Sequence, residues 1–447
     1  MGNIFSTSCC RPNNHDKYKD LTDQSRESDN GEANEDDGIT TNTEYTHLAE
    51  ETIEPVVNSL VTAVAEVRIS LEEQFLDFPF LKDEKTISYI KTSKTMFIMR
   101  GVPGSGKSTI ARALQQVYPS AVICSADNYF MKENEYNYRA DDLGSAHKFC
   151  QEKAVEAVKN DTNVIVIDNT NVKRWEMKFY LDLARQQLYR VVLVQPHTDW
   201  KDDPKVLSSR NSHDVDETTI RKKIKAFEEY VPFYYAWFLN KENSAMVYNK
   251  CYETLTHCVE NVPNFCSFVL GNVCSTRKFL EYFKLVEIPD TVYHCTSKFL
   301  GGPKSDIMGR LDYHNSKHVQ AAYGKSFPIL MTGMIVTSSV VAVRIKLPSE
   351  ESLQLIDKPE ENSDGWFQSK VRHQKGSSAH LTIATADGVP AKYSNSDLLA
   401  ICEMEKTGSV SAPPHKLSFG VVNFWDRYYC SISFDEHVEM NSLFCGS

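Results

Sequence analysis

The segment GVPGSGKST, residues 101–109, restricts the possible folds of this chain more than any other stretch. From Gly101 to Ser108 it matches the pattern G-x-x-x-x-G-K-[ST] in full, between the apolar run TMFIM and the helical pattern TIARALQQV. A glycine-rich turn between a buried strand and a helix is the context that a phosphate-binding loop requires. The motif therefore predicts an α/β domain with a parallel sheet.

The residue types of this loop suit the binding of a nucleotide phosphate. Glycines let backbone amides turn toward an anion, and the amino terminus of the following helix adds positive potential. The lysine can reach the terminal phosphates, and the serine can hold magnesium, so ATP or GTP with Mg²⁺ is the predicted ligand. The predicted nucleotide-binding residues of the loop are Gly101, Gly104, Gly106, Lys107, Ser108 and Thr109.

Two carboxylates follow later strands of the same predicted sheet. Asp127 comes after AVIC and Asp168 ends VIVID; a further run, YRVVLVQP, completes the strands between helical patterns. In a kinase, the first position would suit a base that accepts a hydroxyl proton, and the second would suit a magnesium contact. Ordinary surface carboxylates explain them equally well. Four cations either close over phosphates as a lid or form a solvated helix face: Arg210, Arg221, Lys222 and Lys223.

A second domain begins near Ala226, where the pattern of residue types along the sequence changes. The aromatic segment AFEEYVPFYYAWFL is predicted to be helical, and strand-like runs such as FPILMTGMIVTSSVVAVRIKL and HKLSFGVVNF follow it. We therefore predict a P-loop domain over residues 78–225 and a largely antiparallel α+β domain over residues 226–447.

The amino-terminal segment differs from both domains in charge. Residues 1–77 carry a net charge of −12, close to the −11 of the whole chain of 447 residues. Low hydrophobicity with high charge predicts a mostly disordered tail, with an amphipathic helix over residues 56–76. The remainder is nearly neutral, so composition does not indicate a strongly basic nucleic-acid-binding surface.

The cysteines and apolar runs indicate a reducing compartment and no membrane span. Twelve cysteines occur without a C-x-x-C pair, which favours buried free thiols in a cytoplasmic protein over structural disulfides. No apolar run approaches the length that crosses a bilayer.

Two copies of the pattern H-x-T lie in apolar, strand-like runs of the second domain. They are His294-Cys-Thr296 and His380-Leu-Thr382. Residues two apart in a strand point to the same face, so each pair directs an imidazole and a hydroxyl to one point. A third match to H-x-[ST], at His314, lies in the polar stretch DYHNSKH, which is predicted to be helical.

Such pairs suit the hydrolysis of a cyclic phosphodiester. The reaction needs a base to deprotonate water and an acid to protonate the leaving alkoxide, and histidine can serve in either role. Hydroxyls can donate hydrogen bonds to phosphate oxygens as charge builds there. No metal is required, and no cluster of residues offers zinc spacing. From the pattern alone, two core histidines are an equally good explanation.

Several further segments carry a family resemblance. With the two H-x-T strands, the segments FPFLKDEKT, FIMRGVPGSGKSTIAR, YYAWFL, HCTSKF and YGKSF resemble the 2′,3′-cyclic-nucleotide 3′-phosphodiesterases, the myelin CNPase family with its regeneration-induced fish homologues. The resemblance spans about residues 78–440. It implies a bilobed two-histidine phosphoesterase domain with His294, Thr296, His380 and Thr382 at its centre. It also implies cleavage of the 3′ ester to leave a 2′-phosphate, without a cofactor.

The resemblance implies further contacts and also shows departures. It places Phe299 beside the nucleobase and Tyr234 near the site, and Ser378 stands where mammalian members have an arginine. The implied partners are 2′,3′-cyclic nucleotides or RNA 3′ ends and, by resemblance alone, tubulin and actin of the cytoskeleton. Mammalian members end in a prenylation box, whereas only two residues follow Cys445 here.

The first residues offer another way to reach a membrane. MGNIFS matches M-G-x-x-x-[ST], with Gly2 as the acceptor for myristate, and Cys9 and Cys10 follow as candidates for palmitate. Two acyl chains anchor stably where one does not. The alternative is a coincidental glycine after Met1. These residues predict attachment to the inner face of the plasma membrane.

The sequence thus predicts a membrane-associated 2′,3′-cyclic-nucleotide phosphodiesterase with a P-loop domain. One alternative is a polynucleotide kinase-like enzyme that uses ATP through Lys107 and repairs RNA ends. Another is a membrane–cytoskeleton adaptor that retains the fold with vestigial activity.

Overall fold

The computed structural model describes residues 75–132, 135–287, 289–301, 307–356 and 373–447, all within one compact unit, Glu72–Ser447. The lipidation candidates Gly2, Cys9 and Cys10 lie outside the described residues, as do the acidic tail and all but the end of the predicted helix over 56–76. Among the described residues, no helix combines the length and the apolar character needed to cross a bilayer.

The first domain is built on a parallel sheet, as the sequence predicts. Four strands pair in the order β2-β5-β1-β6, and β1 lies in parallel register with both β5 and β6. Their bounds are β1 Thr95–Met99, β2 Val122–Cys124, β5 Val164–Ile167 and β6 Arg190–Val194. Apart from a few half-buried positions on the outer strands, these residues are buried, which explains their almost continuous apolar sequence.

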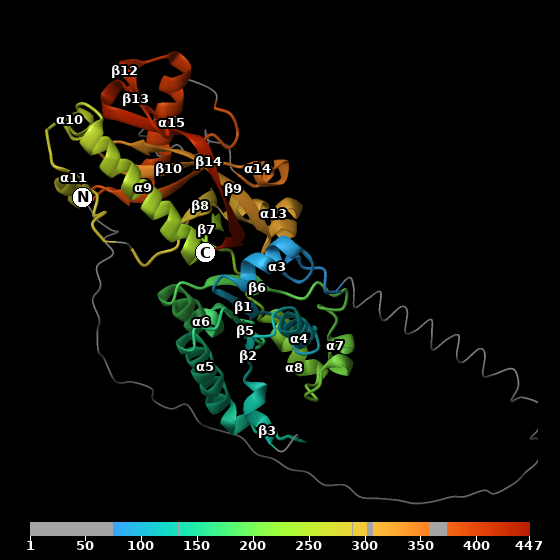
Figure 1. The fold of residues 1–447 in the computed structure, drawn as a ribbon. Helices are drawn as coiled ribbons and strands as arrows, with labels where there is room; N and C mark the ends of the chain where they lie inside the picture. Colours follow the sequence, from blue (N-terminus) through green and yellow to red (C-terminus); the bar gives the residue numbers. More distant parts are fainter. Residues whose placement is uncertain (1–74, 133–134, 288, 302–306, 357–372) are drawn as a thin grey trace, which may run out of the picture. The chain divides into compact units, whose positions relative to one another are not determined.

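Helices cover both faces of this sheet (Figure 1). Helices α5 and α6 lie on one side and α4 on the other, so alternate residues of β1 enter two separate cores. The bounds are α2 Pro79–Lys82, α3 Glu84–Lys91, α4 Lys107–Val117, η1 Asp127–Phe130, β3 Met131–Lys132, β4 Glu135–Tyr136, η2 Ala140–Asp142, α5 Leu143–Lys159, α6 Arg174–Gln186, α7 Pro204–Arg210 and α8 Glu217–Lys225.

The second domain contains an eight-stranded antiparallel sheet in the order β12-β13-β14-β7-β8-β11-β10-β9. The long strand β14 also pairs with β9, which closes six of the strands into a ring. The strands are β7 Tyr234–Phe238, β8 His294–Phe299, β9 Ser326–Val336, β10 Val340–Lys346, β11 His380–Thr385, β12 Val410–Leu417, β13 Gly420–Trp425 and β14 Tyr429–Gly446.

Helices pack around this ring and complete the main core. The largest hydrophobic cluster joins alternate residues of β7, β8, β9 and β11 to α9 and α11. The helices are α9 Lys241–Asn261, α10 Phe265–Leu270, α11 Thr276–Tyr282, α12 Ile307–His314, α13 Lys317–Ala322, α14 Glu350–Leu355, α15 Tyr393–Thr407 and the short η4 Asp426–Tyr428. The predicted antiparallel α+β architecture is confirmed.

The predicted helix over the aromatic segment from Ala226 is wrong. Helix α8 ends at Lys225, and the aromatic residues Tyr234–Phe238 form strand β7. Pro232 lacks the backbone N–H that a helix interior needs, and aromatic side chains favour strands. This correction matters because β7 lies beside β8, the strand that carries His294.

One cysteine pair also departs from the prediction of free thiols. Cys266 and Cys274 form a disulfide, with their Cα atoms 6.0 Å apart. Gly271 ends α10 with a φ of 74°, and this left-handed residue turns the chain back toward the helix. The spacing of the cysteines in the sequence does not predict this turn. The other described cysteines are buried free thiols, as predicted: Cys124, Cys150, Cys251, Cys258, Cys295, Cys402, Cys430 and Cys445.

Candidate active site

The two H-x-T strands are neighbours in the closed sheet. β8 and β11 pair antiparallel with Cys295 opposite Leu381, and both of these residues are fully buried. The positions on either side therefore stand across from one another on the opposite face of the strands. This register puts His294 opposite Thr382 and Thr296 opposite His380.

The burial pattern explains why these four side chains share one face. Over the first four residues of β8 and of β11, half-buried and buried positions alternate, beginning with the half-buried His294 and His380. The buried alternates enter the main hydrophobic core, so they fix which face each histidine occupies. The two imidazoles and two hydroxyls thus form a diagonal arrangement on one side of a rigid sheet.

Hydrogen bonds orient two of these groups. His380 Nδ1 lies 2.7 Å from the backbone oxygen of Ser378, so Nδ1–H donates there and leaves Nε2 for other chemistry. Thr382 Oγ1 donates to Ser394 Oγ at 3.0 Å. Ser378, the position where the family resemblance implies an arginine, therefore acts through its main chain.

Aromatic side chains from β7 flank His294. The ring of Tyr234 stacks on the imidazole with centroids 5.1 Å apart, and the ring of Phe238 lies at 5.2 Å. Phe299 stands opposite Tyr234 at the end of β8 and is 62% exposed. An exposed ring beside a stacked tyrosine gives the site an apolar rim that could contact a nucleobase.

Both histidines favour the neutral state in this environment. The pKa of His294 is lowered to about 4, first by burial and then by the nearby charges of Arg190 and His380. Burial also lowers the pKa of His380, although its hydrogen bond to the carbonyl of Ser378 opposes this shift. An anion bound between the two rings would stabilise an imidazolium and so oppose these shifts.

The third match to the histidine pattern lies apart from these strands. His314 ends α12, where its Nδ1 is 2.5 Å from the hydroxyl of Tyr235. Tyr235 is fully buried in the main core, on the face of β7 opposite to Tyr234. His314 is therefore a structural histidine, and its replacement would disturb the core.

The phosphate-binding loop adopts its expected backbone conformation. Gly104 and Gly106 have φ values of 78° and 101°, which favour glycine over other residues. Lys107, the first residue of α4, is buried and donates from Nζ to the carbonyl of Val102 at 3.1 Å. Ser108 and Thr109 follow it in the first turn of the same helix.

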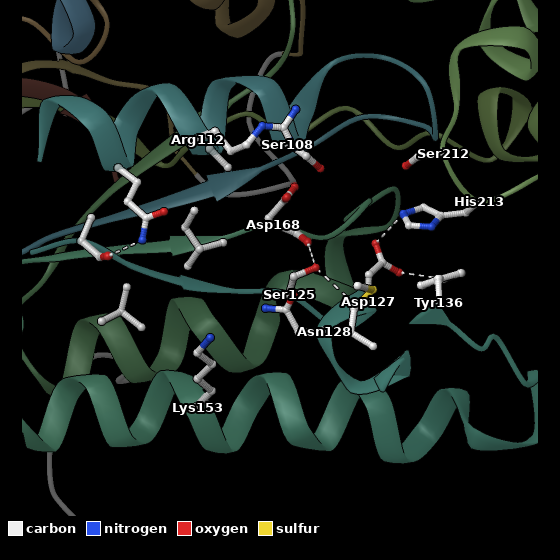
Figure 2. Close-up of a pocket in the computed structure, with 16 residues that line it drawn as sticks. Ser108, Arg112, Ser125, Asp127, Asn128, Tyr136, Lys153, Asp168, Ser212 and His213 are labelled. Carbon is white, nitrogen blue, oxygen red and sulfur yellow. Dashed lines mark hydrogen bonds and ion pairs between the residues drawn. The ribbon is translucent and has the colours of Figure 1, made fainter. Parts of the chain in front are cut away.

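A cavity of about 670 Å³ opens beside this loop (Figure 2). Asp127 lies in its wall, with His213 Nε2 at 3.3 Å from Oδ2 and the Tyr136 hydroxyl donating to Oδ1 at 3.4 Å. Burial raises the pKa of Asp127, but the hydrogen bond and charge of His213 outweigh it, and the pKa falls below its ordinary value. The same contact raises the pKa of His213.

Asp168 lines the same cavity next to Ser108. One of its oxygens, Oδ1, is buried without a hydrogen-bond partner, and the nearby Ser108 hydroxyl favours the ionised carboxylate by lowering its pKa. Burial raises the pKa of Asp168, and the charge of Lys107 opposes the rise. A hydroxyl and a carboxylate oxygen in need of a partner form a donor set that fits Mg²⁺.

The predicted lid residues are spread over two helices, α7 and α8. The Arg210 guanidinium lies 4.0 Å from the centroid of the Trp200 ring, which packs near the phosphate loop through a hydrogen bond to Gly104. Arg221 instead pairs with Glu217 on the surface of α8. On that helix Lys222 is exposed and Lys223 is half-buried. The charge of Lys223 is close enough to lower the pKa of Lys107.

Comparison with known proteins identifies the family. The model described as 2′,3′-cyclic nucleotide 3′-phosphodiesterase matches residues 231–447, and one described as an AAA domain matches residues 96–230. Mouse 2′,3′-cyclic-nucleotide 3′-phosphodiesterase is 31% identical over 84% of this chain and 88% of its own length. The chain belongs to the 2′,3′-cyclic nucleotide 3′-phosphodiesterase family. The resemblance inferred from the sequence is therefore confirmed.

Two other similarities extend beyond this phosphodiesterase family. Human NEDD4-binding protein 2 is 39% identical over 33% of this chain, which is 9% of that protein. A crystal structure of a fungal RNA kinase matches 79% of this chain and 99% of its own, with 12% identity and a TM-score of 0.27. A likeness this distant carries no argument about function.

Sequence reasoning missed several residues around both sites. Phe238 and Ser394 contact the candidate catalytic residues of the phosphodiesterase domain, and His213 and Tyr136 contact Asp127. None of them belongs to a motif, because each reaches its site through tertiary packing. For Phe238 one signal existed, since a strand reading of YYAWF would have aligned it with Tyr234 on one face.

Proposed function

We propose that this protein hydrolyses nucleoside 2′,3′-cyclic phosphates to nucleoside 2′-phosphates by acid–base catalysis between His294 and His380. The observation that carries the proposal is the register of β8 and β11, which sets each histidine opposite the threonine of the other pair. Membership of the phosphodiesterase family supports the reaction class, and the family description names the 3′ ester as the bond that breaks.

The proposed chemistry needs two proton transfers and no covalent intermediate. One imidazole accepts a proton from water as the water oxygen forms a bond to phosphorus. The bond from phosphorus to O3′ breaks, and the other imidazole gives O3′ its proton. Thr296 and Thr382 donate hydrogen bonds to the phosphate oxygens as negative charge builds on them.

The surroundings favour His294 as the base and His380 as the acid. A base must start neutral, and burial with the charge of Arg190 holds His294 neutral. An acid must start protonated, and the Ser378 carbonyl that accepts from His380 Nδ1–H stabilises the imidazolium. An anionic phosphate between the two rings would raise the pKa of His380 and so oppose the effect of burial.

This assignment predicts the pH dependence of the reaction. As pH falls through about 4, His294 becomes protonated and kcat/KM should fall. As pH rises, free His380 loses its proton below the ordinary histidine pKa, so the alkaline limb of kcat/KM should lie below about 6.5. The alkaline limb of kcat should lie higher, because bound phosphate stabilises the imidazolium. Initial rates from pH 3.5 to 9 would check both limbs, and coincident alkaline limbs would contradict the assignment.

The direct test of the proposed function is product analysis. Purified protein is given 2′,3′-cyclic AMP with EDTA and without nucleotide triphosphate, and the product is identified by chromatography against 2′-AMP and 3′-AMP. We expect 2′-AMP alone. No turnover, formation of 3′-AMP, or an absolute requirement for a divalent metal would each refute the proposal.

A second candidate function is phosphoryl transfer by the first domain. The observation that favours it is one cavity whose wall contains Ser108, Asp168 and Asp127 together. A hydroxyl beside Asp127 could lose its proton to the carboxylate while its oxygen attacks the terminal phosphorus of ATP, releasing ADP. Bound Mg²⁺, held by Ser108 and Asp168, would neutralise phosphate charge.

Lys107→Ala separates the two functions. The change removes the charge that faces the nucleotide phosphates, so we expect ATP affinity to fall at least about tenfold, as measured by calorimetry. Hydrolysis of 2′,3′-cyclic AMP should stay within about twofold of wild type, because that chemistry belongs to the other sheet. A large loss of phosphodiesterase activity in the folded variant would show that the phosphate loop itself contributes to the phosphodiesterase site.

Asp127→Asn tests the second candidate function by itself. With radiolabelled ATP and an RNA that carries a 5′-hydroxyl, we expect the wild type to label the RNA. We expect the variant to do so at least about a hundredfold more slowly, because the proton acceptor is lost. If the wild type does not label the RNA, the first domain does not transfer phosphate and at most binds nucleotide.

We also propose that Gly2 carries myristate and that Cys9 and Cys10 carry palmitate, which together hold the protein at the inner face of the plasma membrane. Gly2→Ala should move the protein from the membrane fraction to the cytosol, and replacement of Cys9 and Cys10 should do so in part. Fractionation of expressing cells would check this. A Gly2→Ala protein that stays in the membrane fraction would show that another surface holds it.

A further inference from the structure

The second domain is joined to one edge and one helix of the first. Strand β6 is the edge strand of the parallel sheet, and its Leu193 N–H donates to the hydroxyl of Tyr323 at 3.2 Å. From α3, the hydroxyl of Tyr89 donates to the backbone oxygen of Phe238 at 2.8 Å. The first domain therefore contacts β7 directly, on the strand next to the one that carries His294.

Arg190 extends from this edge toward the histidine face of the second sheet. It is the first residue of β6, and its Cζ lies 4.9 Å from the centroid of the Phe238 ring. Phe238 pairs with His294 in the β-ladder, and their rings are 5.2 Å apart. Two successive ring contacts thus link the guanidinium to the candidate base.

The guanidinium of Arg190 lacks an anion. Its Nε is buried without a hydrogen-bond partner, and among the described residues no carboxylate forms an ion pair with it. By contrast, Arg344 meets Glu405 through two hydrogen bonds. Removing a charge from water without a partner is costly, so the position favours an anion that arrives from outside.

We propose that Arg190 binds the phosphate of the cyclic nucleotide, so that the P-loop domain supplies a cation to the phosphodiesterase site. The proposal rests on the proposed function for the identity of the anion. A guanidinium offers several fixed donors that suit phosphate oxygens, and its contact with the Phe238 ring holds it in place. No motif of the first domain predicts this role. Arg190 lies at the amino-terminal end of its strand, whereas the phosphate loop follows the carboxyl-terminal end of β1.

The same residue also acts on His294 through its charge. The charged or titratable groups that face His294 are Arg190, His380 and the stacked Tyr234. Arg190 favours the neutral imidazole, so its removal should raise the pKa of His294. This shift reports the charge of Arg190 near His294, and the loss of phosphate affinity reports its contact with the substrate.

Arg190→Met is the decisive variant in the full-length protein. Methionine keeps an unbranched apolar stem against Phe238 and removes only the guanidinium. We expect KM for 2′,3′-cyclic AMP to rise about tenfold to a hundredfold, with a smaller change in kcat, and the acid limb of the pH profile to shift upward. Arg190→Lys should restore part of the affinity. Arg185→Met, at an exposed arginine on α6 paired with Asp182, is the matched control and should leave KM unchanged.

Binding of inorganic phosphate gives a second readout that does not depend on turnover. Equilibrium dialysis should show phosphate binding to wild type and Arg185→Met, and about tenfold weaker binding to Arg190→Met. ADP with magnesium is added to all samples to fill the phosphate loop. Equal phosphate affinity, or an unchanged KM and acid limb, in folded Arg190→Met would overturn the proposal. A wild type that binds phosphate through Arg190 but does not hydrolyse the cyclic nucleotide would instead refute the proposed function.

Discussion

Replacing either His294 or His380 by alanine is expected to lower kcat/KM for 2′,3′-cyclic AMP at least about a hundredfold, the low end for a positioned acid or base. Each change removes one of the two proton transfers that the reaction needs. The diagonal register of β8 and β11 leaves no other imidazole beside the site from these strands. Steady-state rates at the optimal pH would measure the loss.

The control for these variants is His437→Ala, an exposed histidine on β14. It should keep wild-type activity, whereas His314 would be a poor control because it bonds the buried Tyr235. Circular dichroism and thermal melting would establish that each variant is folded. A folded His380→Ala protein with near-wild-type turnover would refute the acid–base pair.

The second large effect is expected from the threonines, and it should be unequal. Thr296→Val and Thr382→Val keep a branched side chain in the strand and remove the hydroxyl donor, with an expected loss in kcat of roughly tenfold to a thousandfold. Thr382 contacts Ser394, whose hydroxyl can take over as a donor. We therefore expect Thr296→Val to be the more damaging change.

A further variant tests whether the Ser394 hydroxyl compensates for the loss of the Thr382 hydroxyl. Adding Ser394→Ala to Thr382→Val should bring the loss to that of Thr296→Val, because the substitute hydroxyl is then gone. The same Ser394→Ala change in an otherwise wild-type protein should have only a small effect. If the double variant is no slower than Thr382→Val alone, Ser394 does not substitute, and Thr382 contributes little to phosphate binding.

The sequence predicted best what depends on neighbours along the chain. The strand before Gly101 and the helix after it were correct, because the phosphate loop dictates both. The shared face of His294 and Thr296 followed from the twofold repeat of a strand. The sequence could not predict that β8 and β11 pair directly, because strand order depends on long-range packing.

The errors and omissions arise from tertiary contacts. Periodicity alone cannot tell whether a short apolar run such as YYAWF belongs to a helix or to a strand, and only its burial on both faces identifies a central strand. Arg190 was missed because nothing local distinguishes a charged residue at a strand start from a solvated one. Its proposed role depends on its contact with Phe238, which is distant in sequence and lies in the other domain.

The closed ring of strands also constrains the order of folding during synthesis. Strand β14 is the last element of the described chain, and Leu443–Gly446 pair with β7, whose Phe238 and Tyr234 flank His294. Until those residues leave the ribosome, β7 and β9 both have an unpaired edge, while the parallel sheet of the first domain is already complete. The first domain can therefore fold during translation, whereas the antiparallel sheet of the second domain is complete only after its final strand has been made, and its open edges are exposed to aggregation until then.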